Sequence, residues 1–149
     1  MSTAAPPSAL RPHRFRPRGQ GQRWIVATAA LIAAAAHVPV IGPHLDEAPY
    51  MGILFIVLTV ACLGIAGAIC VRDSAALYAA VAVTCGLAVL GYAATRLVAF
   101  PMLADDVGNW LEPLGVWSVI SETVVVLAAV SALVRRPAAP GAFPAVQPA

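Results

Sequence analysis

Three ionisable side chains lie inside long apolar stretches of this sequence: His37, Arg96 and Glu122. A charged group near the centre of a bilayer costs about 2.5–3.5 kcal/mol on insertion scales, so each of them needs a partner, a proton or a function. Glu122 lies nine residues after Pro113. That spacing is about 13 Å along a helix, close to the middle of a hydrocarbon core about 30 Å thick. We therefore expect Glu122 to face the interior of a helix bundle, protonated or paired.

Two aromatic or hydroxyl side chains accompany these groups at helical spacing. Ser118 lies one turn before Glu122, and Tyr92 lies one turn before Arg96. Buried ionisable groups of this kind often line proton or ion paths in membranes. The residues predicted for a ligand or ion pathway are Glu122, Arg96, Tyr92 and Ser118.

Arg96 has two interpretations that the sequence leaves open. It lies four residues before Phe100, so its long side chain could extend outward to acids in the following link. Alternatively, it could point inward and neutralise Glu122, with Tyr92 hydrogen-bonding the pair. The acids of the link are Asp105, Asp106 and Glu112.

A second interpretation of the polar residues is a metal site that faces outward. Two imidazoles and two carboxylates form a mixed nitrogen and oxygen set that suits a divalent transition metal such as Cu, Zn, Fe or Mn. The candidate ligands are His37, His44, Glu47 and Glu122. Their spacing matches no metal-binding motif, and Pro43 and Pro49 could interrupt the helix that must align them. The alternative is a polar link in which Asp46 and Glu47 complement the dipole of the next helix.

The amino-acid composition indicates whether the helices that carry these residues are surrounded by water or by lipid. Of the 149 residues, 60 % are hydrophobic and 11 % are charged. Soluble domains have about 45–50 % apolar and about 25 % charged residues. This composition excludes an ordinary cytosolic globular domain, a disordered chain and a nucleic-acid-binding module. It predicts a small integral membrane protein whose main partner is the lipid bilayer.

Four apolar segments are long enough to span a bilayer, and short links join them. We expect an all-α integral membrane protein, an up-down bundle of four transmembrane helices in which consecutive helices are antiparallel neighbours. The predicted spans are 24–41, 50–71, 75–100 and 113–134. The transmembrane domain, 24–134, is preceded by a disordered basic arm, 1–23, and followed by a flexible Pro- and Ala-rich tail, 135–149.

The distribution of arginine predicts the orientation. All nine basic residues are Arg; five lie in residues 1–23 and two at positions 135–136, while acids dominate the links 42–49 and 101–112. Because positive charge accumulates on the cytoplasmic side, both termini are predicted inside, in the plasma (inner) membrane. The use of Ala, Pro and Arg without Lys is typical of a GC-rich bacterial genome.

The first segment has an alternative. Basic residues followed by Trp24–Ile32 and the alanines 33–36 are also typical of a secretory signal with an A-x-A cleavage site, which would leave three spans. The small residues nearby have a structural role in either case. Ala30, Ala33 and Ala34 share one helical face that leads to His37, and they would let neighbouring helices approach closely.

These observations favour a membrane protein without enzymatic activity, either an accessory subunit or a ligand-binding or metal-binding component. It would act as a homo-oligomer or within a larger membrane complex. Phosphate-binding glycine loops, a G-x-S-x-G elbow and an H-E-x-x-H motif are absent from the sequence. The alternatives are a metal-dependent or redox membrane enzyme and a small proton or ion transporter that uses Glu122 and Arg96.

Overall fold

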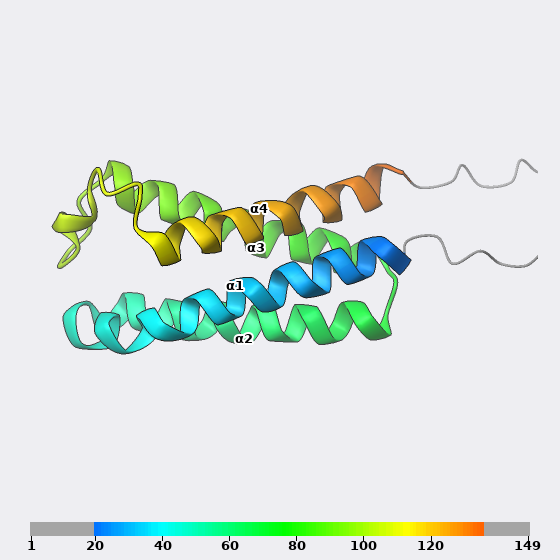
Figure 1. Cartoon of the computed structure of the whole chain (residues 1–149), viewed down its shortest axis with the longest axis horizontal. Helices are drawn as coiled ribbons and strands as arrows, with labels where there is room; N and C mark the ends of the chain where they lie inside the picture. Colours follow the sequence, from blue (N-terminus) through cyan, green and yellow to red (C-terminus); the bar gives the residue numbers. More distant parts are fainter. Residues whose placement is uncertain (1–19, 136–149) are drawn as a thin grey trace, which may run out of the picture.

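The structure, a computed structural model, describes residues 20–135, which form four long helices and one short 3-10 helix (Figure 1). Their bounds are α1 Gln20–Glu47, α2 Pro49–Val71, α3 Ala75–Leu97, η1 Ala104–Asp106 and α4 Pro113–Val134. All four long helices are long and apolar enough to cross a membrane. This confirms the prediction of an all-helical protein with four candidate spans. The predicted arm and tail lie outside the described residues, apart from 20–23 and Arg135.

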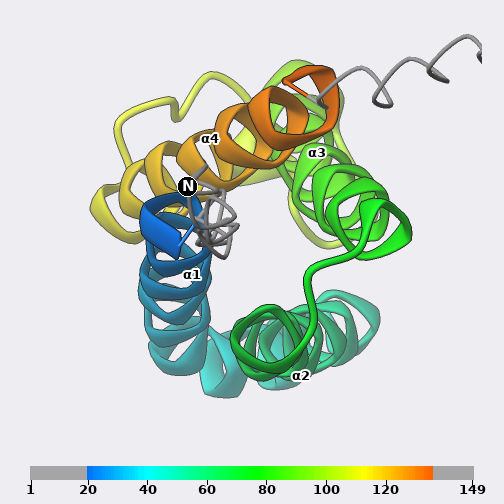
Figure 2. The same ribbon diagram turned by 90° about the vertical axis from the view of Figure 1, so that its right-hand side faces the viewer.

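The helices form a bundle that is open on one side. α1 packs along both α2 and α4, and α3 packs along α4, whereas α2 and α3 make few contacts. Figure 2 shows the separation of α2 and α3 in a view along the bundle. Consecutive helices are therefore neighbours for α1–α2 and α3–α4, but the prediction is wrong for α2–α3. The link between them leaves α2 in extended conformation at Arg72 (φ −124°, ψ 141°), which carries the chain away from α2 before Ser74 caps α3.

Close packing on α1 depends on its alanines. Ala33 and Ala34 are buried against Cys62 of α2, and Ala30 is buried in a larger apolar cluster with residues of the other helices. Lipid provides no hydrophobic drive for helix association, so small side chains that bring backbones together contribute strongly. The alanines 33–36, considered above as a cleavage site, lie in the middle of α1, and three of the four are buried.

α1 is longer than the predicted span, because it continues through Pro39 and Pro43 to Glu47. Proline is tolerated inside membrane helices, where neighbouring groups compensate for the lost hydrogen bonds. Only Ala48, fully buried, separates α1 from Pro49, the first residue of α2. Proline at this position has the backbone angle that a helix start requires. The corner is tight: a Cβ on Gly52 would lie 2.7 Å from Leu45.

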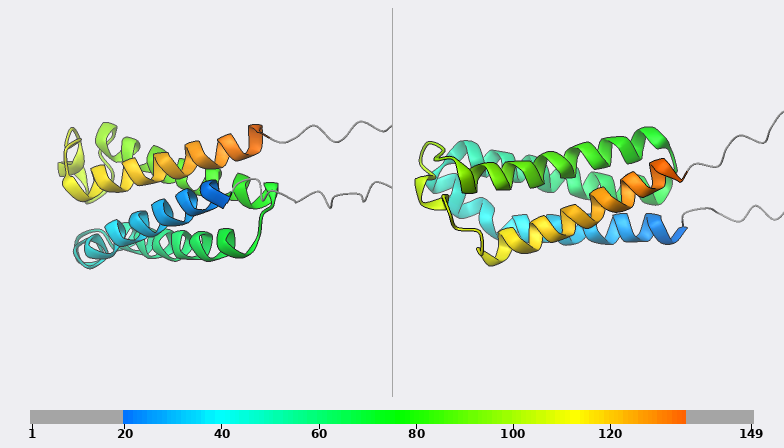
Figure 3. Two further views of the ribbon diagram at one scale, coloured as in Figure 1. Left: turned by 45° about the vertical axis from the view of Figure 1, so that its right-hand side comes forward. Right: turned by 90° about the horizontal axis from the view of Figure 1, so that it is seen from above.

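The two ends of the bundle differ. At one end, here called the terminal end, α1 begins, α4 ends and residues 72–74 link α2 to α3 (Figure 3). At the other end, here called the loop end, lie the α1–α2 corner and residues 98–112.

At the terminal end, side chains from the first turn of α1 donate hydrogen bonds to carbonyl groups of the neighbouring helices. Gln22 donates to Ala128 O of α4 (2.9 Å) and Arg23 donates to Ile69 O of α2 (2.9 Å). The contact of Arg23 supplies a partner for one of the carbonyls that the C-terminal turn of a helix leaves free.

The side chain of Tyr92 on α3 lies directly against Gly115 of α4, and this contact allows a test of the packing. A Cβ at this position would lie 2.5 Å from Tyr92 Cε2 and 2.8 Å from Glu112 Oε2. We expect Gly115→Ala to lower the free energy of unfolding in detergent by about 1–3 kcal/mol, the usual cost of overpacking. The matched control is Gly86→Ala on α3, where a Cβ meets nothing within 4 Å. It should leave stability unchanged or raise it by up to about 1 kcal/mol. Equal effects of the two substitutions would contradict the predicted close approach.

Candidate functional site

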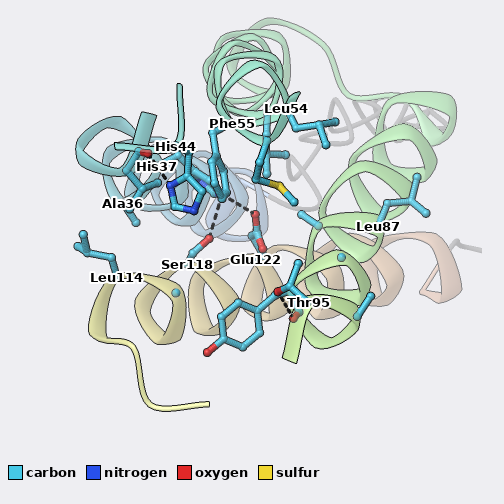
Figure 4. Close-up of a pocket in the computed structure, with 18 of the residues that line it drawn as sticks. Ala36, His37, His44, Leu54, Phe55, Leu87, Thr95, Leu114, Ser118 and Glu122 are labelled. Carbon is cyan, nitrogen blue, oxygen red and sulfur yellow. Dashed lines mark hydrogen bonds and ion pairs between the residues drawn. The ribbon is translucent and has the colours of Figure 1, made fainter. Parts of the chain in front are cut away.

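A cavity of about 610 Å³ lies at the loop end of the bundle, and residues from all four helices line it (Figure 4). It occupies the side on which α2 and α3 stand apart. Its walls are largely apolar and include Leu54, Phe55, Leu58, Leu87, Ala88 and Leu114. Its polar lining residues include several that the sequence analysis had identified.

A polar cluster lies deep in this cavity and joins α1 to α4. His37 Nε2 is 3.2 Å from Ser118 Oγ and 3.6 Å from Glu122 Oε1. The three residues are 4 %, 8 % and 1 % exposed. Figure 4 shows the three side chains pointing toward one another. The prediction that Glu122 faces the interior therefore agrees with its position, and its neighbour is His37 rather than Arg96.

The hydrogen bonds of His37 determine which groups remain available. Its Nδ1 atom is 2.5 Å from Ala33 O, and a carbonyl oxygen only accepts, so Nδ1 donates. In the neutral imidazole Nε2 is then the acceptor, and the Ser118 hydroxyl donates to it. Glu122 Oε1 is left buried without a hydrogen-bond partner within the described chain. A polar atom of this kind, aimed into a cavity, marks a place where a ligand group could bind.

Arg96 lies at the mouth of the cavity and extends outward. Its Nη1 atom is 2.5 Å from Asp106 Oδ1 and donates to Asp106 O at 3.2 Å. Its guanidinium group stacks on Tyr92, with Cζ 4.6 Å from the ring centroid. Of the two interpretations of Arg96, the structure shows the outward one, in which Arg96 contacts the loop acid Asp106. The reason is local, because Arg96 lies one residue before the end of α3 and the turn of η1 places Asp106 directly against it.

The loop 98–112 is fastened over the mouth by hydrogen bonds from the helices. Tyr92 donates to Trp110 O at 2.9 Å, and Tyr50 of α2 donates to Pro101 O at 2.7 Å. Glu112 caps α4, since its carboxylate accepts from the amides of Leu114 (3.1 Å) and Gly115. The two acids that line the mouth, Asp106 and Glu112, therefore both have hydrogen-bond partners within the protein.

The four predicted metal ligands are not brought together. His37 and His44 are seven residues apart on one continuous helix, which separates them by about 10 Å along its axis. His44 Nδ1 is 2.8 Å from Val40 O, and its ring packs edge-on against Phe55; Glu47 is exposed at the end of α1. Over residues 20–135 no group of three or more His, Cys, Asp or Glu side chains could hold a metal ion. These four residues therefore do not form one set of metal ligands. Residues 42–47, which were expected to form a link, continue α1 instead and keep His44 and Glu47 away from His37.

Phe55 is a residue of the site that the sequence analysis missed. Its ring lies 5.5 Å from that of His37 and 4.8 Å from that of His44, measured between centroids. A phenylalanine inside an apolar span carries no signal that distinguishes it from a lipid-facing residue. Its position opposite two histidines follows from how α2 packs on α1.

No protein-family model, no curated protein and no solved structure matches this chain. The chemistry available to the site is that of its own side chains. These provide an imidazole, a hydroxyl and a carboxyl group at depth, and an Arg–Asp pair at the mouth.

The Arg96–Asp106 contact can be tested with two neighbouring acids. We expect Asp106→Asn to lower stability by about 1–3 kcal/mol, because Arg96 loses a charged hydrogen-bond partner while remaining buried. Hydrogen exchange in residues 98–112 should become faster in the same variant. Asp105 is exposed and makes no such contact in the structure, so Asp105→Asn is the control and should change neither measurement. Identical exchange in both variants would exclude a role of this contact in holding the loop.

Proposed function

We propose that this protein is a membrane-embedded binding component that holds a lipid-soluble molecule in the cavity between α2 and α3. The polar group of the ligand would lie at His37, Ser118 and Glu122. One observation carries the proposal: an apolar-walled cavity of about 610 Å³ contains a single deep polar cluster with an open acceptor. Ligand sites in proteins are typically about 300–1,000 Å³ and combine apolar walls with a few placed polar groups.

The open side of the bundle supports access from the lipid. Leu54 of α2 and Leu87 of α3 both line the cavity, yet they are 56 % and 63 % exposed. They therefore lie at its rim, and the cavity opens between them. In a bilayer this opening would face acyl chains, so an apolar ligand could enter without crossing water. The protein would serve as an accessory component of a homo-oligomer or a larger membrane complex, passing on or sensing such a ligand.

Transport and catalysis have less support than binding. A proton or ion path through Glu122 and Arg96 would have to continue to the terminal end, where the described residues form an apolar cluster. Its fully buried members include Val26, Ala30, Ile69, Val81 and Val125. The polar cluster of His37, Ser118 and Glu122 is not arranged for hydrolysis either. Ser118 and Glu122 both face His37 Nε2, whereas a catalytic triad needs the acid on Nδ1.

The proposal includes an orientation: both termini in the cytoplasm of a bacterium and the cavity in the outer half of the plasma membrane. Its support is the separation of charge between the two ends. Arg23, Arg72 and Arg135 lie at the terminal end, and the acids of α1, η1 and the loop lie at the loop end. Positive charge on the cytoplasmic side follows the general rule.

Binding can be measured with single-chain probes that differ in their head groups: dodecylamine, dodecan-1-ol and dodecanoate. We expect saturable binding of one molecule of at least one probe to the reconstituted protein, counted by native mass spectrometry. Ala88→Phe fills the cavity and should weaken that binding about tenfold or more. The control is Val83→Phe, which places the same aromatic side chain on the exposed face of α3 outside the cavity. The absence of saturable binding by every probe, or equal loss in both variants, would refute the proposed function.

Orientation can be measured by cysteine labelling after the three native cysteines, Cys62, Cys70 and Cys85, are replaced by alanine. A membrane-impermeant maleimide should label Asp105→Cys in intact cells. It should label Asp73→Cys, in the α2–α3 link, only after the cells are permeabilised. The reverse pattern would show that the cavity faces the cytoplasm.

A further inference from the structure

We infer that the occupant of this cavity carries a protonated amine, whose ammonium group binds Glu122 in place of a proton. The inference depends on the binding function proposed above and specifies the chemical class of the ligand: an apolar or single-chain molecule with a primary or substituted ammonium head.

The charges that line the cavity favour a cation. One arginine, Arg96, stands against three acids, Asp106, Glu112 and Glu122. Arg96 and Asp106 neutralise each other at the mouth. Glu112 has both carboxylate oxygens occupied by amides at the start of α4, where the helix dipole favours a negative charge. The acid with an oxygen left open is Glu122; an anionic ligand would meet these acids and an arginine that is already paired with Asp106 and keeps only its Nε–H without a partner.

The hydrogen bonds around Glu122 leave a place for a donor that belongs to the ligand. Oε1 is buried and has no hydrogen-bond partner within residues 20–135. A neutral His37 does not donate to it, because its one N–H, on Nδ1, is directed to Ala33 O. A carboxylate at this depth in a bilayer requires a proton or a cation beside it. An ammonium group supplies both the donor and the charge.

An aromatic wall beside the cluster adds a second feature that suits a cation. Phe55 lines the cavity and packs against the rings of His37 and His44. Figure 4 shows Phe55 beside His37, with Ser118 and Glu122 opposite. A cation within about 6 Å of an aromatic face is attracted by the ring, more strongly when water is excluded. The face of Tyr92, which also lines the cavity, is already occupied by Arg96.

Binding would exchange one cation for another. The O–H bond of the Glu122 carboxylic acid breaks, its proton passes to solution, and the N–H of the ammonium group takes its place on the carboxylate. The titratable groups that face Glu122 are His37 from α1, Cys62 from α2 and Cys85 from α3; Ser118 lies on its own helix. The proton released on binding is the one that the carboxyl group of Glu122 loses when the ammonium group takes its place.

The experiment uses the full chain in phosphatidylcholine nanodiscs, with empty nanodiscs to subtract partitioning into lipid. Calorimetry at pH 7 in two buffers of different ionisation enthalpy gives both affinity and the number of protons released. We expect dodecylamine to bind about tenfold or more tightly than dodecan-1-ol, and to release close to one proton. Glu122→Gln should weaken dodecylamine binding about tenfold or more and abolish the proton release. Glu47→Gln makes the same change on an exposed residue outside the cavity and should alter neither.

A second variant keeps the test informative if Glu122→Gln fails to assemble. Phe55→Leu retains an apolar wall and removes the aromatic face, and it should weaken dodecylamine binding about 2- to 10-fold. Equal affinity for dodecylamine and dodecan-1-ol without proton release would overturn the ammonium assignment and leave the binding function intact. Tightest binding of dodecanoate would overturn it too, and would identify Arg96 as the anchor. If no probe binds, the binding function itself is refuted.

Discussion

The burial of Glu122 is the constraint on which the rest of the structure depends. A carboxyl group within a helix that could cross a membrane must face protein, and here Glu122 faces His37 across the α1–α4 contact. His37 is in turn held by the carbonyl of Ala33 and by Ser118. Because these groups belong to two helices, their contacts favour one rotation of α1 and one register of α1 against α4. The polar cluster therefore has a structural role as well as a chemical one.

The cavity results from unequal packing around α1. The alanines of α1 let α2 and α4 approach closely, whereas α3 is held by α4 and by the loop 98–112. Leu54 of α2 and Leu87 of α3 line the space between these two helices and are exposed, so the cavity is open on this side. The cavity thus lies where α2 and α3, which make few contacts with each other, are both held by other helices.

The site was predicted in part. The interior orientation of Glu122 followed from the cost of an exposed charge in lipid, and the place of Arg96 near the end of its segment followed from counting residues along a helix. The partner of Arg96 stayed undecided, because either Asp106 or Glu122 was within reach of its long side chain. The four candidate metal ligands are not brought together, because α1 continues through Pro39 and Pro43 to Glu47 and keeps His37 and His44 about 10 Å apart along its axis. The neighbours that replace the lost hydrogen bonds are not visible in the local pattern.

The sequence by itself determined the four apolar segments, the scarcity of charge within them and the identity of the ionisable residues that need an explanation. These properties depend on composition and on spacing along one helix, which local residues decide. The tertiary structure decided that His37 meets Glu122, that Arg96 meets Asp106, that Phe55 joins the site and that α2 stands away from α3. Each of these depends on the relative rotation and spacing of different helices. Those are set by side-chain packing across the whole bundle, and no single segment contains that information.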